Sequence, residues 1–178
     1  MMKYRYLLLV FSLLIPLPLQ AALKIFACEP EWAALAQELG GEHVDVTSAT
    51  QAMQDPHYIQ ARPSLIARVR KADLLICTGA GLEAGWLPVL LRKGNNPRIL
   101  DGQAGYLMAS EHVMMKEIPA SVDRSMGDVH AEGNPHIQTD PRNIARVAGV
   151  LADRLKGLDS ANREEYQRRY EDFSLRWN

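Results

Sequence analysis

Three histidines in this sequence stand where an imidazole could bind a metal ion. His130 and His136 lie close together in a segment rich in Gly, Asn and Pro, and His57 lies far upstream. Asp-Pro precedes His57 and Asn-Pro precedes His136, so the two share a flanking pattern. Proline fixes its own φ and keeps the preceding residue out of the helical region, which places each ring on a stiff, non-helical segment. Because neutral imidazole is a common zinc ligand, we expect these segments to face each other across a metal site.

The same spacing leaves less specific interpretations open. The sequence has no H-x-x-x-H or C-x-x-C motif, and a loop histidine is more often solvated or a cap, which is our interpretation of His43 and His112. His130 could complete a set of three imidazole ligands or could rest on the surface, and the pattern favours neither. Asp128 and Glu132 could orient ligands, although loop carboxylates are more often simply solvated.

Residues 1–22 have the pattern of an export signal. Two basic residues precede an apolar run from Leu7 to Leu19, and Ala21-Ala22 supplies small residues for cleavage. The apolar run is interrupted by proline and is too short for a membrane span. No cysteine stands directly after the cleavage site for lipid attachment, so we expect a soluble periplasmic protein, secreted with its signal peptide cleaved.

Length and net charge limit the number of domains and the kinds of partner expected for the rest of the chain. The residues after position 22 are numerous enough for one domain with a hydrophobic core. The formal net charge of the 178-residue chain is −1, and this near balance gives no reason to expect nucleic acid or an anionic surface as a partner.

From residue 23 the chain alternates short apolar runs with amphipathic segments. The apolar runs predict strands over residues 23–28, 44–49, 74–77 and 98–100. The segments between and after these runs predict helices over residues 30–39, 63–72 and 82–91. Such alternation indicates an α/β fold with a parallel four-stranded sheet flanked by helices. Ligands of these sheets bind beyond the carboxyl ends of the strands, where the His57 segment is expected.

The second half of the chain predicts a long connection followed by two helices. Residues 103–139 read as an irregular passage, and such a passage inside a domain is usually functional or mobile. A helix is expected over residues 140–155 and another from residue 160. The last helix has one stripe of aromatic residues, namely Tyr166, Tyr170, Phe173 and Trp177. The chain ends inside this helix, so we expect a truncation that leaves the stripe exposed.

Cys28 and Cys77 are the only cysteines. Each is expected at the end of a strand, and the two strands should be neighbours in the sheet. An oxidising compartment would allow a disulfide between them. Both positions are apolar, however, and cysteine also serves as a small buried apolar residue, so we slightly favour two free thiols.

Three segments resemble, in the right order, the zinc/manganese solute-binding proteins of bacterial ABC importers. D-P-H-Y-I-Q-A-R-P-S at 55–64 resembles that family's D-P-H-x-Y-E-x-x-P-S element. The segment at 71–83 resembles its A-D-L-V-x-x-x-G-x-x-L-E strand and turn, and N-P-H-I-Q-T-D-P at 134–141 resembles its D-P-H-x-W-L-D-P element. Residues 124–130 look like a subgroup with a longer second histidine loop. The resemblance covers residues 23–178.

This resemblance implies one lobe of a bilobal metal-binding protein, in which a long helix joins two α/β lobes that clamp the metal. Residues 1–22 would be the signal peptide and 23–139 the amino-terminal α/β metal-binding lobe. Residues 140–178 would be a helical segment that ends in a partial long helix, the start of the inter-lobe helix. The first two imidazole ligands map to His57 and His136, and the remaining ligands would come from the second lobe.

The implied function is to bind a divalent transition metal in the periplasm for an inner-membrane ABC permease. Zn²⁺ is favoured over Mn²⁺ because imidazoles suit zinc, whereas Mn²⁺ prefers carboxylates. His130 could act as a further ligand in this lobe. Gln60 and Gln138 replace a Glu and a Trp of the family's motifs, which concerns the groups around the ligands rather than the ligands themselves. We expect no nucleic acid partner, and membrane contact only through the permease and the cleaved signal peptide.

Two alternatives remain open. A secreted zinc-dependent hydrolase would need an open metal position and a general base. Glu132 is not in an H-E-x-x-H arrangement and no G-x-S-x-G motif exists, so we do not expect an enzyme. The other alternative is a non-functional truncated fragment, which an exposed aromatic stripe would support.

Overall fold

The computed structural model describes residues 21–123 and 129–177 of the chain. Residues 1–20 of the expected signal peptide lie outside this part, as does Asp128 of the histidine loop. Within the described ranges, no helix combines the length and the apolar character that crossing a membrane requires.

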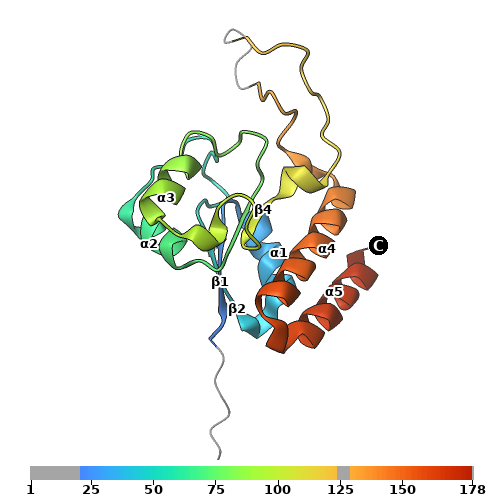
Figure 1. Ribbon diagram of the computed structural model, residues 1–178. Helices are drawn as coiled ribbons and strands as arrows, with labels where there is room; N and C mark the ends of the chain where they lie inside the picture. The colour runs from blue at the N-terminus through green and yellow to red at the C-terminus, as the bar shows by residue number, and fades with distance from the viewer. Residues whose placement is uncertain (1–20, 124–128, 178) are drawn as a thin grey trace, which may run out of the picture.

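The centre of the fold is a parallel sheet of four strands in the order β2-β1-β3-β4 (Figure 1). Its strands are β1 (Leu23–Ala27), β2 (Val44–Ser48), β3 (Leu74–Cys77) and β4 (Tyr106–Met108). In the register, Ile25 of β1 pairs with Val46 on one side and with Leu74 on the other. Because the strands are parallel, their carboxyl ends meet at one edge of the sheet, the carboxyl edge. Their amino ends meet at the opposite amino edge.

Helices cover both faces of this sheet (Figure 1). They are α1 (Pro30–Gly40), α2 (Pro63–Lys71), α3 (Leu87–Gly94), α4 (Pro141–Leu158) and α5 (Arg163–Trp177). Helices α2 and α3 share a core with Phe26 and Leu75, whereas α1, α4 and α5 share a core with Ile25 and Leu74. The expected α/β class, with a parallel four-stranded sheet flanked by helices, is confirmed.

The prediction of a strand at residues 98–100 is wrong. Pro97–Ile99 form a short 3₁₀ helix, because Pro97 has no N–H for a strand ladder and the Asn96 side chain accepts from Arg98 N. The buried Asn96 also donates to two backbone carbonyls at the end of α2, which fixes the turn. The fourth strand lies instead at Tyr106–Met108, inside the passage expected to be irregular.

A loop on the carboxyl edge, residues 79–86, replaces the start of the helix expected over 82–91. Its first three residues have positive φ, a conformation that turns the chain away from a helix, and α3 begins only at Leu87. The Glu83 carboxylate accepts from the backbone N–H of Thr78 at 2.8 Å and thereby holds the turn. We call this segment the edge loop.

The aromatic stripe of α5 is covered by this chain, so the expected exposed stripe is wrong. Tyr166 is 0 % exposed and Phe173 is 6 % exposed, and both belong to the core that α1 and α4 share with the sheet. Trp177 stays 44 % exposed, and its Nε1 donates to the carbonyl of Pro141 at 2.9 Å. The stripe therefore gives no support to the alternative of a non-functional fragment.

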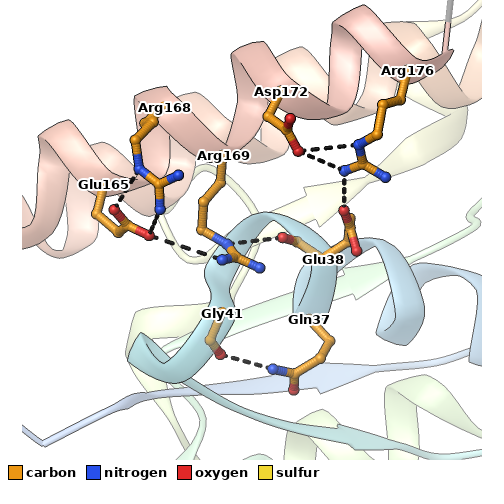
Figure 2. A network of polar contacts seen from close by, with 8 residues as sticks. All are labelled: Gln37, Glu38, Gly41, Glu165, Arg168, Arg169, Asp172 and Arg176. Carbon is orange, nitrogen blue, oxygen red and sulfur yellow. Dashed lines mark hydrogen bonds and ion pairs between the residues drawn. The ribbon is translucent and has the colours of Figure 1, made fainter.

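Figure 2 shows the polar contacts that fasten α5 to α1. Arg169 Nε donates to the carbonyl of Glu38 at 3.0 Å, and Arg176 forms an ion pair with the Glu38 carboxylate. Arg176 also donates to Asp172 one turn earlier in α5. Exposed pairs of this kind contribute at most about 1 kcal/mol each, so the buried aromatic rings supply most of the attachment.

Cys28 and Cys77 form a disulfide, and the preference for two free thiols is wrong. Cys28 directly follows β1 and Cys77 ends the neighbouring strand β3, with 4.7 Å between the two Cα atoms. Such a separation lies in the range that a disulfide spans. The bond ties two strands together at the carboxyl edge, beside the edge loop.

Glu29 and Glu83 form a buried pair of carboxyl groups at the same edge. Each residue is 3 % exposed, and each accepts a hydrogen bond from the Thr78 N–H, at 3.2 and 2.8 Å. Burial, with the neighbouring Glu83 carboxylate, raises the pKa of Glu29 well above its usual value. Burial raises the pKa of Glu83 as well, so the pair holds a proton at neutral pH.

We expect Glu29→Gln to flatten the pH dependence of stability. The Glu29 carboxyl has a higher pKa in the folded chain than the 4.5 of a free side chain, so unfolding at neutral pH releases a proton. Its stabilising contribution is complete below about pH 4.5 and declines as the pH rises, by at most about 1.4 kcal/mol per pH unit. Urea unfolding between about pH 5 and pH 8 should show this decline in the wild type and a smaller one in Glu29→Gln. The exposed Glu42→Gln is the control, and equal slopes in all three chains would contradict the buried proton.

Candidate metal centre

His57 is held by the aspartate that precedes it in the Asp-Pro-His motif. The backbone N–H of His57 donates to Asp55 Oδ1 at 2.9 Å, and the ring Nδ1 lies 2.7 Å from the same oxygen. These hydrogen bonds hold the pKa of the Asp55 carboxyl below its usual value, so it stays ionised and accepts a hydrogen bond from Nδ1–H. A neutral ring with its proton on Nδ1 presents a lone pair on Nε2, the atom available to a metal.

His136 sits in the same local structure as His57. Its backbone N–H donates to Asn134 Oδ1 at 2.9 Å, in the way that His57 donates to Asp55. The Asn134 side-chain amide in turn donates to Glu117 Oε2 at 2.7 Å. The repeated Asx-Pro-His pattern of the sequence therefore corresponds to a repeated turn, and the ring of His136 is exposed at the protein surface.

The structure brings His130 directly beside His57. The two Nε2 atoms lie 3.2 Å apart, and the rings stack with their centroids 5.3 Å apart. Together with His136 they line one pocket of about 390 Å³. The remaining lining residues of this histidine pocket are Glu117, Val129, Gly133, Asn134 and Pro135.

The three histidines line this pocket without converging on one point. Across residues 21–123 and 129–177, a single group of three metal-ligating side chains has all its ligand atoms within 4.8 Å of one another. That group is Cys28, Cys77 and Glu83, and its two sulfurs are already joined in the disulfide. His57 and His130 are thus a close pair of imidazoles, and His136 stands at the rim of the same pocket.

The edge loop packs closely against the segments that carry His57 and His130. A side chain at Gly81 would place its Cβ 3.3 Å from His130 Nδ1, and one at Gly85 would place it 3.2 Å from the carbonyl of His57. Trp86, at the end of the loop, donates from Nε1 to the carbonyl of Pro56 at 2.7 Å. The loop therefore packs against both histidine segments, and a side chain larger than glycine at residue 81 or 85 would crowd them.

Two acidic residues fall in places that the sequence did not indicate. Glu117 has a positive φ of 55°, lines the histidine pocket and is bound by Asn134, yet no motif singled it out. Glu132 does not line this pocket. It lines a neighbouring hollow of about 250 Å³ with Glu83 and Glu111, so the residue weighed as a general base is not among those that line the pocket of the close histidine pair.

Comparison with known proteins places this architecture in one family. The family "Zinc-uptake complex component A periplasmic" (ZnuA) matches residues 25–178. A manganese ABC transporter substrate-binding lipoprotein, PsaA of Streptococcus anginosus, is 25% identical over 155 residues, which are 85% of this chain and 47% of the relative. An iron ABC transporter substrate-binding lipoprotein, MtsA of Streptococcus pyogenes serotype M1, is 22% identical over 149 residues, which are 82% of this chain and 45% of the relative.

Solved structures share the fold. A crystal structure of ZnuA superposes with a TM-score of 0.68 at 23% identity, over 88% of this chain and 55% of that one. A 138–173 deletion mutant of ZnuA with zinc bound gives a TM-score of 0.71 at 24% identity, over 88% and 54%. The Mn-bound periplasmic metal-binding protein of candidatus liberibacter asiaticus gives 0.68 at 18% identity, over 85% and 52%.

The match is extensive for this chain but partial for its relatives. The chain spans about half the length of the curated relatives it matches. The family match nevertheless runs through the sheet, the histidine pocket and both last helices. This chain therefore belongs to the ZnuA family of solute-binding proteins, which are not enzymes.

Proposed function

We propose that this chain binds a divalent transition metal ion as part of the solute receptor of a metal ABC importer. The observation that carries the proposal is the close approach of His57 Nε2 and His130 Nε2, 3.2 Å apart in a shared pocket. The ionised Asp55 behind His57 fixes the tautomer that leaves Nε2 free for a metal. His136, at the rim, is the third ligand in this proposal.

Zn²⁺ is the metal that this set of side chains suits best. Three imidazoles are zinc-like donors, whereas Mn²⁺ favours carboxylate oxygens. Relatives are named for zinc, manganese and iron, so the family alone does not fix the metal. Among the residues that the structure describes, Glu117 is the one carboxylate that lines the histidine pocket, and the Asn134 amide already donates to one of its oxygens.

The proposed setting is the periplasm, and the proposed partner is the inner-membrane permease of the importer. The segment through residue 139 would act as the amino-terminal metal-binding lobe, and residues 140–178 as the helical segment toward a second lobe. The buried aromatic ring of Tyr166 supports one continuous core for both segments. A second lobe would complete the coordination of the metal, as the resemblance of the sequence implies.

Calorimetry on the chelator-stripped chain tests this function. We expect one Zn²⁺ site per chain, with Zn²⁺ bound more tightly than Mn²⁺ when the two compete. Binding of neither metal would refute the proposed function. Tighter binding of Mn²⁺ would refute the choice of zinc and would point to carboxylate ligands.

We expect Trp86→Phe to weaken Zn²⁺ binding by roughly three- to tenfold, since groups that orient metal ligands usually have effects of this order or larger. Phenylalanine fills most of the buried space but cannot donate to the Pro56 carbonyl, so the His57 segment loses an anchor. Trp32→Phe is the matched control, because the Trp32 side chain is as buried as that of Trp86 and its indole also donates one hydrogen bond, to Thr78 Oγ1. Equal effects of both substitutions on zinc affinity would mean that Trp86 acts through general stability alone.

A further inference from the structure

Exposed cationic side chains gather at the amino edge of the sheet, opposite the histidine pocket. They come from the start of β1, the last turns of α2 and α3, and the 3₁₀ helix before β4. We call this group the basic edge, and it consists of Lys24, Arg68, Arg70, Lys71, Arg92, Lys93 and Arg98.

One half of the basic edge is a shallow hollow between β1 and α2. Lys24, Arg68 and Lys71 line this hollow of about 240 Å³, with Asp45 of β2 as its carboxylate. Arg68 and Lys71 form no ion pair with any residue of 21–123 or 129–177. Two long cationic side chains thus stand in solvent beside the first residues of the sheet.

An ion pair and hydrogen bonds connect the remaining cations of the basic edge to the residues around the hollow. Arg98 pairs with Asp73, and Asp73 also accepts from the Lys24 N–H at 2.9 Å. The Arg70 guanidinium donates to the carbonyl of Lys93 at 3.3 Å, which links the ends of α2 and α3. The cations are therefore neighbours on one continuous surface rather than scattered positions.

The net charge of −1 conceals this separation of charge. Four carboxylates lie at this edge, namely Asp45, Asp73, Asp101 and, in the 3₁₀ helix directly before β2, Glu42, and they are fewer than the seven cations. The acidic side chains near the histidine pocket lie at the other edge and include Asp55, Glu117 and Glu132. The total charge therefore does not exclude an anionic partner for the amino edge, because a partner responds to the local field.

We propose that the basic edge docks on the anionic headgroups of a phospholipid membrane. A protein partner would require a buried apolar anchor at the centre of the contact. Among residues 21–123 and 129–177, the large exposed apolar side chain beside the basic edge is Leu100, at 42 % exposure. Lysine and arginine side chains without such an anchor suit a diffuse layer of phosphate groups, where each cation strengthens partitioning several-fold.

Docking through the basic edge would set the direction of the histidine pocket. The pocket lies at the carboxyl edge, so it would face away from the lipid, on the side where the proposed second lobe would complete the site. In Figure 1, β1 begins at one end of the fold, and the yellow and orange segments before α4 lie at the opposite end. The proposal does not depend on which metal the chain binds.

Vesicle sedimentation tests the proposal with two double variants of the chain, purified as the cell makes it. Arg68→Gln with Lys71→Gln removes two unpaired charges from the basic edge. Arg142→Gln with Arg146→Gln removes two exposed charges from the first turns of α4, at the end of that helix nearer the histidine pocket. All chains share the same amino terminus, so any contribution of residues 1–22 cancels in the comparison.

The wild type is expected to sediment with vesicles of equal parts phosphatidylglycerol and phosphatidylcholine, and not with phosphatidylcholine alone. The edge variant should partition roughly tenfold less than the wild type, and the matched variant should behave as the wild type. Raising the salt from about 0.1 M to about 1 M should abolish binding, because the screening length falls to about 3 Å. Equal partitioning of the two variants, or no preference for the anionic vesicles, would overturn the proposal. Zinc affinity measured on the same samples should be equal in all chains, which separates this result from the proposed function.

Discussion

Replacing His57 by alanine is expected to weaken Zn²⁺ binding by roughly a hundredfold or more, since removing even an outer group that orients a ligand costs up to about a hundredfold. The substitution removes one of the two imidazoles that face each other at 3.2 Å. It also leaves Asp55 without the ring that it orients. Asp55→Asn keeps a hydrogen-bond acceptor beside the His57 ring but removes the negative charge of Asp55. We therefore expect an intermediate loss of zinc affinity, of about tenfold.

Calorimetry with chelator-stripped protein measures this series. His112→Ala is the matched control, because His112 lies in a short 3₁₀ helix outside the residues that line the pocket. Its affinity should equal that of the wild type. Undiminished zinc affinity in His57→Ala would remove this residue from the site and, with it, the proposed metal centre.

The second large effect is expected from the disulfide. Converting Cys28 and Cys77 to alanine should lower the free energy of unfolding by about 4 kcal/mol, because the bond closes a loop across a sequence separation of 49 in the unfolded chain. Both positions are fully buried in the sheet core, so alanine fits there with little other change.

Urea unfolding with and without a reducing agent measures the contribution of this bond. The reducing agent should destabilise the wild type to the level of the double variant and should leave the double variant unchanged. Titration of the denatured protein with a thiol reagent is an independent check. Two reactive thiols per chain before reduction would contradict the disulfide.

The parts of this fold that could be predicted are those in which neighbouring residues decide the outcome. Residues 74–77 are apolar throughout, so they read as a buried parallel strand, which β3 is. The turns at His57 and His136 could be predicted because each is made by the Asx residue two positions earlier. Three of the four strands and the repeated turn follow from patterns of this local kind.

The parts that could not be predicted depend on contacts between distant segments. Residues 99–100 and 106–108 are both short apolar runs; Pro97 disfavours a strand at the first, and pairing with β3 makes the second a strand. From the sequence alone the aromatic stripe of α5 is expected to be exposed, because no local pattern shows that α1 and α4 of this chain bury it. The approach of His130 to His57, across a sequence separation of 73, likewise depends on the whole sheet.

The long stretch of sequence between His57 and His130 links metal supply to the lifetime of the protein. The segments that carry His57 and His130 meet only when the strands between them are paired, so an unfolded chain lacks the site. With metal bound as proposed, a free metal concentration of 100 times the dissociation constant would add about 2.7 kcal/mol to the free energy of unfolding. Proteases that attack the opened chain would then remove metal-free molecules roughly a hundredfold faster than loaded ones. Turnover of the protein would thus report on the metal available in its compartment.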